Sequence, residues 1–390
     1  MQEAYIVKAF RTAVGKAPRG SLRIVRPDDM AARVIKHILE TTPELDPSRV
    51  DDVIVGCAVP EAEQNLQIGR YISLLSLPVN VPGFVINRYC GSGVEAIALA
   101  VNKIRSGWAD IIIAGGAESM SLVPMTGWKV APNPYLVDTH ADYFMNMGLT
   151  AEEVAKKYGI TREEQDEFAY RSHMRAIKAI EEGIFKDQIV PLEVEQVYYE
   201  DGKKKTRKYI FDTDEGPRKD TSLEKLAQLK PVFRKDGTVT AGNSSQRSDG
   251  ASFVLVVSER VVKELNLKPI ARMVSYAYTG VEPRYMGIGP VYAVPKALKL
   301  AGLNIGDIDL IELNEAFAAQ SVAVVKELEL DIEKVNINGG AIALGHPLGA
   351  TGAKLTTQLI YDLHRLNKKY GIVTACVGGG QGVAAVYEAL

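Results

Sequence analysis

Short runs of aliphatic residues alternate with longer amphipathic stretches at both ends of this chain. Unbroken aliphatic runs are typical of strands buried on both faces, and apolar positions three or four residues apart are typical of helices. In the first third, this pattern predicts strands at residues 4–9, 52–57, 84–87 and 110–114 and helices at 27–39, 66–75 and 92–106. In the last third, it predicts strands at residues 271–276, 310–313 and 372–376 and helices at 294–301, 316–328 and 349–366. This alternation predicts an α/β fold in which helices cover buried parallel strands.

The two ends of the chain share one order of elements. Residues 51–56 (DDVIVG) and 308–313 (IDLIEL) have similar patterns of acidic and aliphatic residues. A glycine-rich junction follows at a similar distance in each half, and it holds Cys90 in the first and His346 in the second. We therefore expect two pseudo-repeated halves.

The stretch between the halves is more polar and contains most of the irregular composition. Methionine and proline cluster between residues 120 and 147, and a charged helix at 161–182 starts with a capping box. Strands at residues 194–199 and 206–211 flank Asp201-Gly202, which is a hairpin signal. These features predict an inserted domain that covers a site.

A buried-strand pattern at residues 251–257 returns after this insertion, and we expect that strand to rejoin the first half. The chain then divides into a first half (residues 1–118 plus 241–268), an inserted loop domain (119–240) and a second half (269–390).

Composition narrows the function classes. The chain has 390 residues, 46% of them apolar, and a net charge of −2, so neither nucleic acid nor an anionic membrane is an expected partner. No apolar run approaches the ~18 residues of a membrane span, and the N-terminal residues lack the apolar core of a secretory signal. The 3 cysteines are far apart, which argues against a disulfide framework, and we expect a cytoplasmic protein.

Cys90 is the first candidate for chemistry. It lies in residues 87–93 (NRYCGSG), between an apolar strand and the start of an amphipathic helix. The free N–H groups and partial positive charge of a helix start stabilise a thiolate, so we expect a lowered thiol pKa and a nucleophilic cysteine. A small buried residue in a tight turn is the alternative interpretation.

His346 is the strongest candidate for a base. Glycine and proline surround it in residues 338–349 (NGGAIALGHPLG), which implies an unusual backbone path. The other histidines lie in helical patterns or in a loop without supporting residues. Asn314 follows the strand at 310–313, where it suits either a helix N-cap or a role in catalysis.

The remaining cysteines both end predicted strands. Cys376 is followed closely by Gly378, Gly379 and Gly380, a sequence that lets backbone N–H groups face a ligand. Cys57 has no such glycines after it, and we expect a structural role for it. Standing alone, Cys376 would also be interpreted as a buried strand residue.

Taken in order, these motifs resemble the thiolase family. They are residues 87–93, 115–120 (GGAESM), 314–317 (NEAF), 339–349 and 376–380 (CVGGG), and the similarity runs from residue 3 to residue 390. Residues 147–152 and 241–246 are most similar to the 3-ketoacyl-CoA thiolases of β-oxidation. The resemblance implies a five-layer α-β-α-β-α sandwich of two five-stranded halves with a loop domain inserted in the first. It also implies an acetyl-CoA C-acyltransferase that cleaves 3-ketoacyl-CoA, or runs in reverse as a Claisen condensation.

The resemblance implies a role for each motif residue. Cys90 would carry the acyl group as a thioester, and His346 would accept its proton. Asn314 would hold a water that binds the thioester oxygen of the acetyl unit together with His346. Cys376 would exchange the proton on the acetyl-CoA carbon, and the backbone N–H groups of Cys90 and Gly378 would form a second oxyanion hole. Coenzyme A would be a substrate, with no permanently bound cofactor and no metal.

Other positions match the family's coenzyme A contacts. Ser245 corresponds to a residue along the pantetheine channel, and Arg218 to one beside the adenine nucleotide. Met286 and Phe317 would line the acyl and pantetheine end. The basic run at residues 203–208 is a weaker phosphate candidate, because hairpin tips are usually only solvated.

Several positions depart from common family residues. Many members have Cys where this chain has Ala350, Ala or Ser where it has Gly91, and Met where it has Gln381. Short-chain biosynthetic thiolases often carry histidine where Asn146 stands, and Arg247 is an unexpected charge beside the pantetheine-channel motif. These departures bear on acyl-chain preference more than on the mechanism.

Other functions stay open at this point. The main alternative is an acetoacetyl-CoA thiolase (acetyl-CoA C-acetyltransferase) that works biosynthetically, and a non-catalytic coenzyme A- or lipid-binding relative is another. Condensing enzymes of fatty-acid synthesis share the helix-start cysteine but not a second catalytic cysteine such as Cys376. As partners we expect acyl-CoA and CoA and further copies of the chain in a homodimer or homotetramer. A chain that is active only in complex with a hydratase/dehydrogenase subunit is a further alternative.

Overall fold

The computed structural model describes residues 2–390, and its first half is built on strands in the order β4-β3-β5-β8-β1, with β2 paired to β8. These strands are β1 (Ala4–Arg11), β2 (Gly15–Lys16), β3 (Asp52–Gly56), β4 (Gly83–Ile86), β5 (Ile111–Ser119) and β8 (Ser248–Ser258). β3 runs parallel to β4 and β5, whereas β8 is antiparallel to β5 and β1. The expected return of the chain into the first half through β8 is confirmed, but the expectation of parallel strands is wrong for β8 and β1.

The second half repeats this arrangement in the order β10-β11-β12-β9. Its strands are β9 (Ala271–Gly280), β10 (Leu310–Leu313), β11 (Tyr370–Val377) and β12 (Gln381–Ala389). β10 is parallel to β11, and β12 is antiparallel to both β11 and β9. Val335 forms only an isolated parallel bridge with Ile311, at the place that β4 has in the first half. The pseudo-repeat is therefore confirmed, although four strands and a bridge replace the five strands that the resemblance implied.

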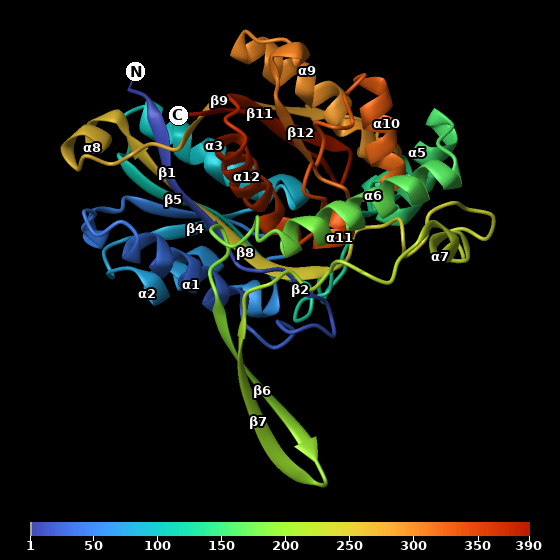
Figure 1. Ribbon diagram of the computed structural model, residues 1–390, viewed down its shortest axis with the longest axis horizontal. Coiled ribbons are helices and arrows are strands. Elements are labelled where there is room, and N and C mark those ends of the chain that lie inside the picture. Colours follow the sequence, from blue (N-terminus) through green and yellow to red (C-terminus); the bar gives the residue numbers. More distant parts are fainter. Residues whose placement is uncertain (1) are drawn as a thin grey trace.

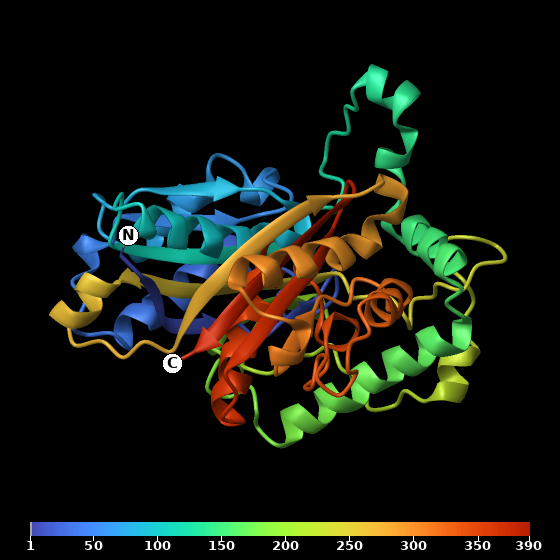
Figure 2. The same ribbon diagram turned by 90° about the horizontal axis from the view of Figure 1, so that it is seen from above.

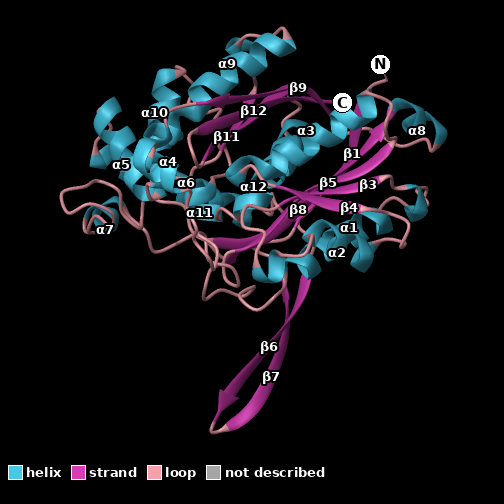
Figure 3. Cartoon of the chain, turned by 180° about the vertical axis from the view of Figure 1, so that it is seen from behind, coloured by secondary structure: helices cyan, strands magenta, loops and turns pink. Residues whose placement is uncertain are grey.

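Helices form three layers around these strands (Figure 3). The first half contributes α1 (Pro27–Glu40), α2 (Ile68–Ser76), α3 (Ser92–Arg105) and α8 (Glu259–Glu264). The second contributes α9 (Gly289–Ala301), α10 (Ala318–Glu327), α11 (Ala341–Leu344) and α12 (Leu348–Arg365). α1 and α2 pack on the outer face of the first half, and α9 and α10 on the outer face of the second.

The middle layer consists of α3 and α12. Apolar side chains such as Ile97 on α3 and Leu359 on α12 pack in one cluster with inward-facing residues of both sets of strands, including Val256 and Val373. The five-layer α-β-α-β-α sandwich is confirmed. The two sets of strands join edge to edge through one residue pair, Ile6 with Ala271, so that they form one continuous sheet.

The insertion leaves the first half after β5 and returns at β8. It contains α4 (Pro134–Thr139), α5 (Met147–Tyr158), α6 (Arg162–Glu181), β6 (Leu192–Glu200), β7 (Lys203–Phe211) and α7 (Leu223–Ala227). The predicted capping box of α6 is present, because Thr161 and Glu164 exchange side chain to backbone hydrogen bonds of 2.9 and 3.2 Å. The predicted β6–β7 hairpin projects from the body in Figure 1, and the segment that contains α4 projects in Figure 2.

Within residues 2–390, no helix is both long enough and apolar enough to cross a membrane.

Candidate active site

The catalytic candidates all lie where parallel strands of the two halves end. Cys90 lies between β4 and α3, and His346 directly precedes α12. Asn314 follows β10, and Cys376 is the penultimate residue of β11. Ligand sites in α/β proteins usually form at the carboxyl ends of parallel strands. The pseudo-repeat therefore places the two glycine-rich junctions at one end of the molecule.

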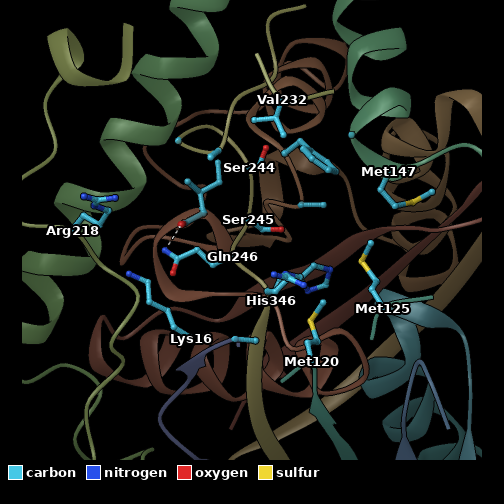
Figure 4. A pocket seen from close by; sticks show the side chains of 18 of the residues that line it. Lys16, Met120, Met125, Met147, Arg218, Val232, Ser244, Ser245, Gln246 and His346 are labelled. Carbon is cyan, nitrogen blue, oxygen red and sulfur yellow. Dashed lines mark hydrogen bonds between the residues drawn. The ribbon is translucent and has the colours of Figure 1, made fainter. Parts of the chain in front are cut away.

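One cavity of about 1010 Å³ opens at this place and takes its walls from both halves and from the insertion. Cys90 and His346 line it. The predicted coenzyme A contacts Ser245, Arg218, Met286 and Phe317 also line this cavity. In Figure 4, His346 lies between Arg218 on one side and Met125 and Met147 on the other. Asn314, Cys376 and Gly378 are buried and are not among the residues that line it.

A strained turn presents Cys90. Tyr89 has φ of 42°, in the left-handed region that non-glycine residues rarely adopt, and the turn leads directly into α3. The backbone N–H groups of Cys90 and of Gly378 point at the Cys90 sulfur. Left-handed conformations of bulky residues cluster at functional sites, where the surrounding structure holds them.

The thiol of Cys90 has a raised pKa, not the lowered pKa expected from its place at a helix start. Burial raises this pKa to about 11, and the negative charge of Glu118 acts in the same direction. The two N–H groups lower it, but they do not offset the loss of water around the sulfur. The resting nucleophile is therefore a protonated thiol that needs a base.

Hydrogen bonds fix the tautomer of His346. The Thr351 hydroxyl donates to the carbonyl of Pro347 at 2.9 Å, so its oxygen accepts from Nδ1–H of His346 at 2.6 Å. Nε2 is then the unprotonated nitrogen, and its lone pair accepts a hydrogen bond from Asn314. Burial, followed by the charge of Lys354, lowers the pKa of His346 to about 3. His346 is a neutral imidazole with its basic nitrogen defined.

Asn314 contacts this basic nitrogen directly. Its Nδ2 lies 3.2 Å from Nε2 of His346. Its Oδ1 is buried and has no hydrogen-bond partner among residues 2–390. A buried orphan acceptor of this kind is a natural position for a bound water. The N-cap of α10 is Phe317, so Asn314 does not serve as the helix cap that its sequence context also allowed.

Cys376 is fully buried among apolar residues that include Met286 and Phe317. Burial, followed by the nearby Cys90, raises the pKa of the Cys376 thiol. Cys57 is also buried, and its sulfur lies 3.8 Å from Oε1 of Glu118, away from the cavity lining. Cys90 and Cys376 thus lie close together as two protonated thiols, and Cys57 stays outside the pair.

Glu118 is a residue whose importance the sequence did not reveal. Its buried carboxylate accepts hydrogen bonds from Ala58 N at 2.7 Å, Gly349 N at 2.8 Å and Gln64 Nε2 at 2.8 Å. Gly349 belongs to α12 of the second half, and the other donors belong to the first. Glu118 therefore clamps the segment after His346 to the half that carries Cys90. Its signals in the sequence were its place in the motif at residues 115–120 and at the end of an apolar strand, and neither assigned it a role.

The mouth of the cavity is basic. Arg218 pairs with Asp220 at 3.2 Å, and its backbone N–H donates to Nδ1 of His173 at 3.2 Å. Lys16, which the sequence did not single out, lines the same region. Burial, followed by the charges of Arg218 and Lys16, lowers the pKa of His173 to about 4. This mouth suits a ligand with phosphate groups.

The basic run at residues 203–208 lies on the projecting hairpin and does not line the cavity. Lys205 pairs with Glu200 in the same hairpin, and Lys208 lies 3.3 Å from Glu193. Across residues 2–390, no group of three His, Cys, Asp or Glu side chains is arranged to hold a metal ion.

Comparisons with known proteins agree with this geometry. Residues 4–260 match the thiolase N-terminal domain family, and residues 267–389 match the thiolase C-terminal domain family. The chain is 53% identical to a 3-ketoacyl-CoA thiolase of Bacillus subtilis, with all of both chains covered. It is 47% identical to an acetyl-CoA acetyltransferase of Pseudomonas aeruginosa over 98% of each chain. The crystal structure of the Bacillus anthracis acetyl-CoA acetyltransferase superposes with a TM-score of 0.89 at 42% identity, covering 100% of this chain and 99% of that one.

Proposed function

This chain belongs to the thiolase family, and on that premise we propose how its side chains carry out the reaction of a 3-ketoacyl-CoA thiolase. It is an acyltransferase that cleaves 3-ketoacyl-CoA with coenzyme A into acetyl-CoA and a shortened acyl-CoA. The reverse reaction is a Claisen condensation.

In the first step, Nε2 of His346 takes the proton of Cys90, and the sulfur attacks the 3-keto carbon. The bond between C2 and C3 breaks, and its electron pair leaves as the enolate of acetyl-CoA. Cys376 gives its proton to that enolate, while His346 and a water on Asn314 hold the enolate oxygen. The products are acetyl-CoA and an acyl thioester on Cys90.

In the second step, coenzyme A removes the acyl group. Its thiol passes a proton to the Cys376 thiolate and attacks the thioester carbon. The N–H groups of Cys90 and Gly378 stabilise the oxyanion. The Cys90 sulfur then leaves and recovers its proton from His346, which restores both starting states.

One observation carries this proposal. His346 is held as a neutral base with Nε2 unprotonated, and it lines the same cavity as a Cys90 sulfur that faces two N–H groups. A neutral thiol beside a neutral base is a competent starting state for nucleophilic catalysis.

The sharpest test separates the two cysteines. Acyl transfer from acetyl-CoA to Cys90 exchanges one thioester for another and needs no proton transfer on carbon. Cys376→Ala should therefore still accumulate an acetyl group on Cys90, measured by intact-mass spectrometry. Its thiolysis and its synthesis of acetoacetyl-CoA should both fall by about 10²–10⁴-fold or more.

Two further variants complete the test. Cys90→Ala should lose acetylation and turnover together, and Cys57→Ala should stay within a few-fold of wild type. Normal turnover by Cys376→Ala would refute its assigned role. Thiolysis rates across 3-ketoacyl-CoA chain lengths, with acetoacetyl-CoA included, would then distinguish degradative from biosynthetic preference.

The proposal extends to partners and location. Acyl-CoA and coenzyme A are the small-molecule partners, and the basic mouth around Arg218 and Lys16 supports binding of their phosphates. We place the chain in a homodimer or homotetramer in the cytoplasm, a reducing compartment that suits its three buried free cysteines.

A further inference from the structure

Arg247 is a charged residue that the reaction above does not use. It lies in the extended segment that leads into β8, where its carbonyl accepts the N–H of Ala17 at 2.9 Å. Its backbone forms a parallel bridge with His346, and the N–H of His346 donates to the carbonyl of the preceding Gln246 at 3.2 Å. The backbone of Arg247 is therefore fixed next to the catalytic base.

The side chain of Arg247 is exposed and lines the catalytic cavity, without a counter-ion in the described part of the chain. The carboxylates that line this cavity are engaged elsewhere. Glu215 accepts the N–H of Lys16 at 2.6 Å and the N–H and hydroxyl of Ser21, and Asp220 pairs with Arg218. A guanidinium beside apolar walls gains most from a ligand that brings its own anion.

The backbone neighbours of Arg247 pack around Cys90, where the acyl group is carried in the proposed reaction. Ala17, which is bonded to its carbonyl, packs with Met120 and Leu348 around Cys90. Met120 is also bonded through its N–H to the carbonyl of Ser248, the next residue after Arg247. Arg218 lies across His346 from Met125 in Figure 4, with Lys16 near it. The cations at that mouth can bind the phosphates of coenzyme A, so the charge of Arg247 is not needed for phosphate binding.

We propose that Arg247 binds a carboxylate at the far end of the acyl chain, which makes 3-ketoacyl-CoA esters of dicarboxylic acids the favoured substrates. This inference rests on the proposed thiolase reaction and specifies its substrate class. The guanidinium offers a bidentate partner to the carboxylate, whereas a plain alkyl end would leave the charge unpaired.

The test compares thiolysis of two 3-ketoacyl-CoA esters of equal chain length, one ending in a methyl group and one in a carboxylate. We expect wild-type protein to have the higher kcat/KM for the carboxylate ester. Arg247→Leu should reduce the carboxylate-to-methyl ratio at least tenfold while the methyl ester reacts as well as before or better. The carboxylate-to-methyl ratio of Arg247→Lys should lie between those of wild type and Arg247→Leu, because an ammonium group binds a carboxylate less specifically than a guanidinium does. Lys203→Leu on the distant hairpin is the matched control for loss of one positive charge, and its ratio should equal that of wild type.

Two outcomes would overturn the inference alone. One is an equal loss of kcat/KM on both esters in Arg247→Leu. The other is a loss that disappears when the esters and the acceptor are built on dephospho-coenzyme A, because Arg247 would then bind the 3′-phosphate. Wild-type protein that cleaves neither ester would instead refute the thiolase reaction, and this inference with it.

Discussion

At the scale of single residues, the protonation states of Cys90 and His346 decide how the reaction starts. Burial holds Cys90 as a thiol and His346 as a neutral imidazole, because each charged form would lose its water. The ion pair of a thiolate and an imidazolium is therefore a transient state. A substrate carbonyl that takes the developing charge makes the proton transfer productive.

The pH dependence of alkylation follows from this. Because the pKa of Cys90 is about 11, its thiolate fraction should rise about tenfold for each pH unit below that value. Inactivation of free enzyme by iodoacetamide should therefore accelerate without a plateau between about pH 7 and 10. The measurement is residual thiolysis against time, with peptide mapping to locate the label.

The control for this experiment is protection by acetyl-CoA, which should acylate Cys90 and slow its labelling. A rate that levels off near pH 8 would contradict the raised pKa. It would support the thiolate expected from the helix start alone.

Single residues also show where sequence information ends. Cys90, His346 and Cys376 stand in glycine-rich junctions after strands, and such local patterns can be read from the chain. The direction of the Cys90 pKa could not be predicted, because it depends on how far walls from distant segments exclude water. Thr351 was not predicted for a related reason. In the sequence it is one more polar residue of a helix, and only the structure shows that its hydroxyl contacts His346.

At the scale of elements, the contact between α12 and the first half sets the spacing of the two catalytic junctions. Glu118 at the end of β5 binds Gly349 N in the first turn of α12. A Cβ at Gly349 would lie 2.6 Å from Cα of Cys57 and 2.7 Å from Oε2 of Glu118. Only glycine allows this approach, since the Cys57 backbone cannot move aside.

Gly349→Ala should therefore push α12 away from the first half. We expect the free energy of unfolding to fall by about 1–3 kcal/mol, the usual cost of overpacking, and thiolysis to fall about 10²-fold. Urea denaturation and initial rates measure the two effects. Gly306→Ala is the matched control, because no described atom lies within 4 Å of its added Cβ. A Gly349→Ala protein with wild-type stability and rate would show that the clamp is not needed.

Elements were predicted well where their pattern is local. Most helices and strands lie within a few residues of their expected positions, and the hairpin around Asp201-Gly202 forms as expected. Strand direction was not local information: β8 returns after the long insertion, lies between β5 and β1, and runs antiparallel to both. β12 was not predicted, since it starts within a glycine-rich stretch whose extended path becomes clear only beside β9 and β11.

The whole molecule has two surfaces suited to self-association. β4 is the outer strand of the first half, and the exposed apolar residues Leu66 and Val79 lie before it in sequence, flanking α2. Trp128 and Tyr135 are 65% and 71% exposed in the projecting segment of Figure 2. An open sheet edge and a large exposed apolar patch both favour contact with another chain.

We expect light scattering to give at least twice the monomer mass of 42.5 kDa. Val79→Lys near the sheet edge should weaken the dimer, whereas Trp128→Lys should leave a dimer and prevent only further association. Recovery of the monomer mass for wild-type protein at working concentrations would reject the assembly. Equal effects of the two variants would show that one surface serves both contacts.

The route of the insertion has a consequence for how such a chain can change over generations. Ser119 and Asp249 are hydrogen-bonded neighbours on β5 and β8, so everything between them departs from and returns to one rung of the sheet. The insertion can be lengthened, shortened or exchanged without a change in the register of β5 and β8. The free energy cost of closing a loop rises only slowly as the loop grows. Recombination with its two breakpoints at Ser119 and Asp249 would exchange the whole insertion, which covers the cavity, in one event. A lineage could thus acquire a new substrate preference while its catalytic residues stay unchanged.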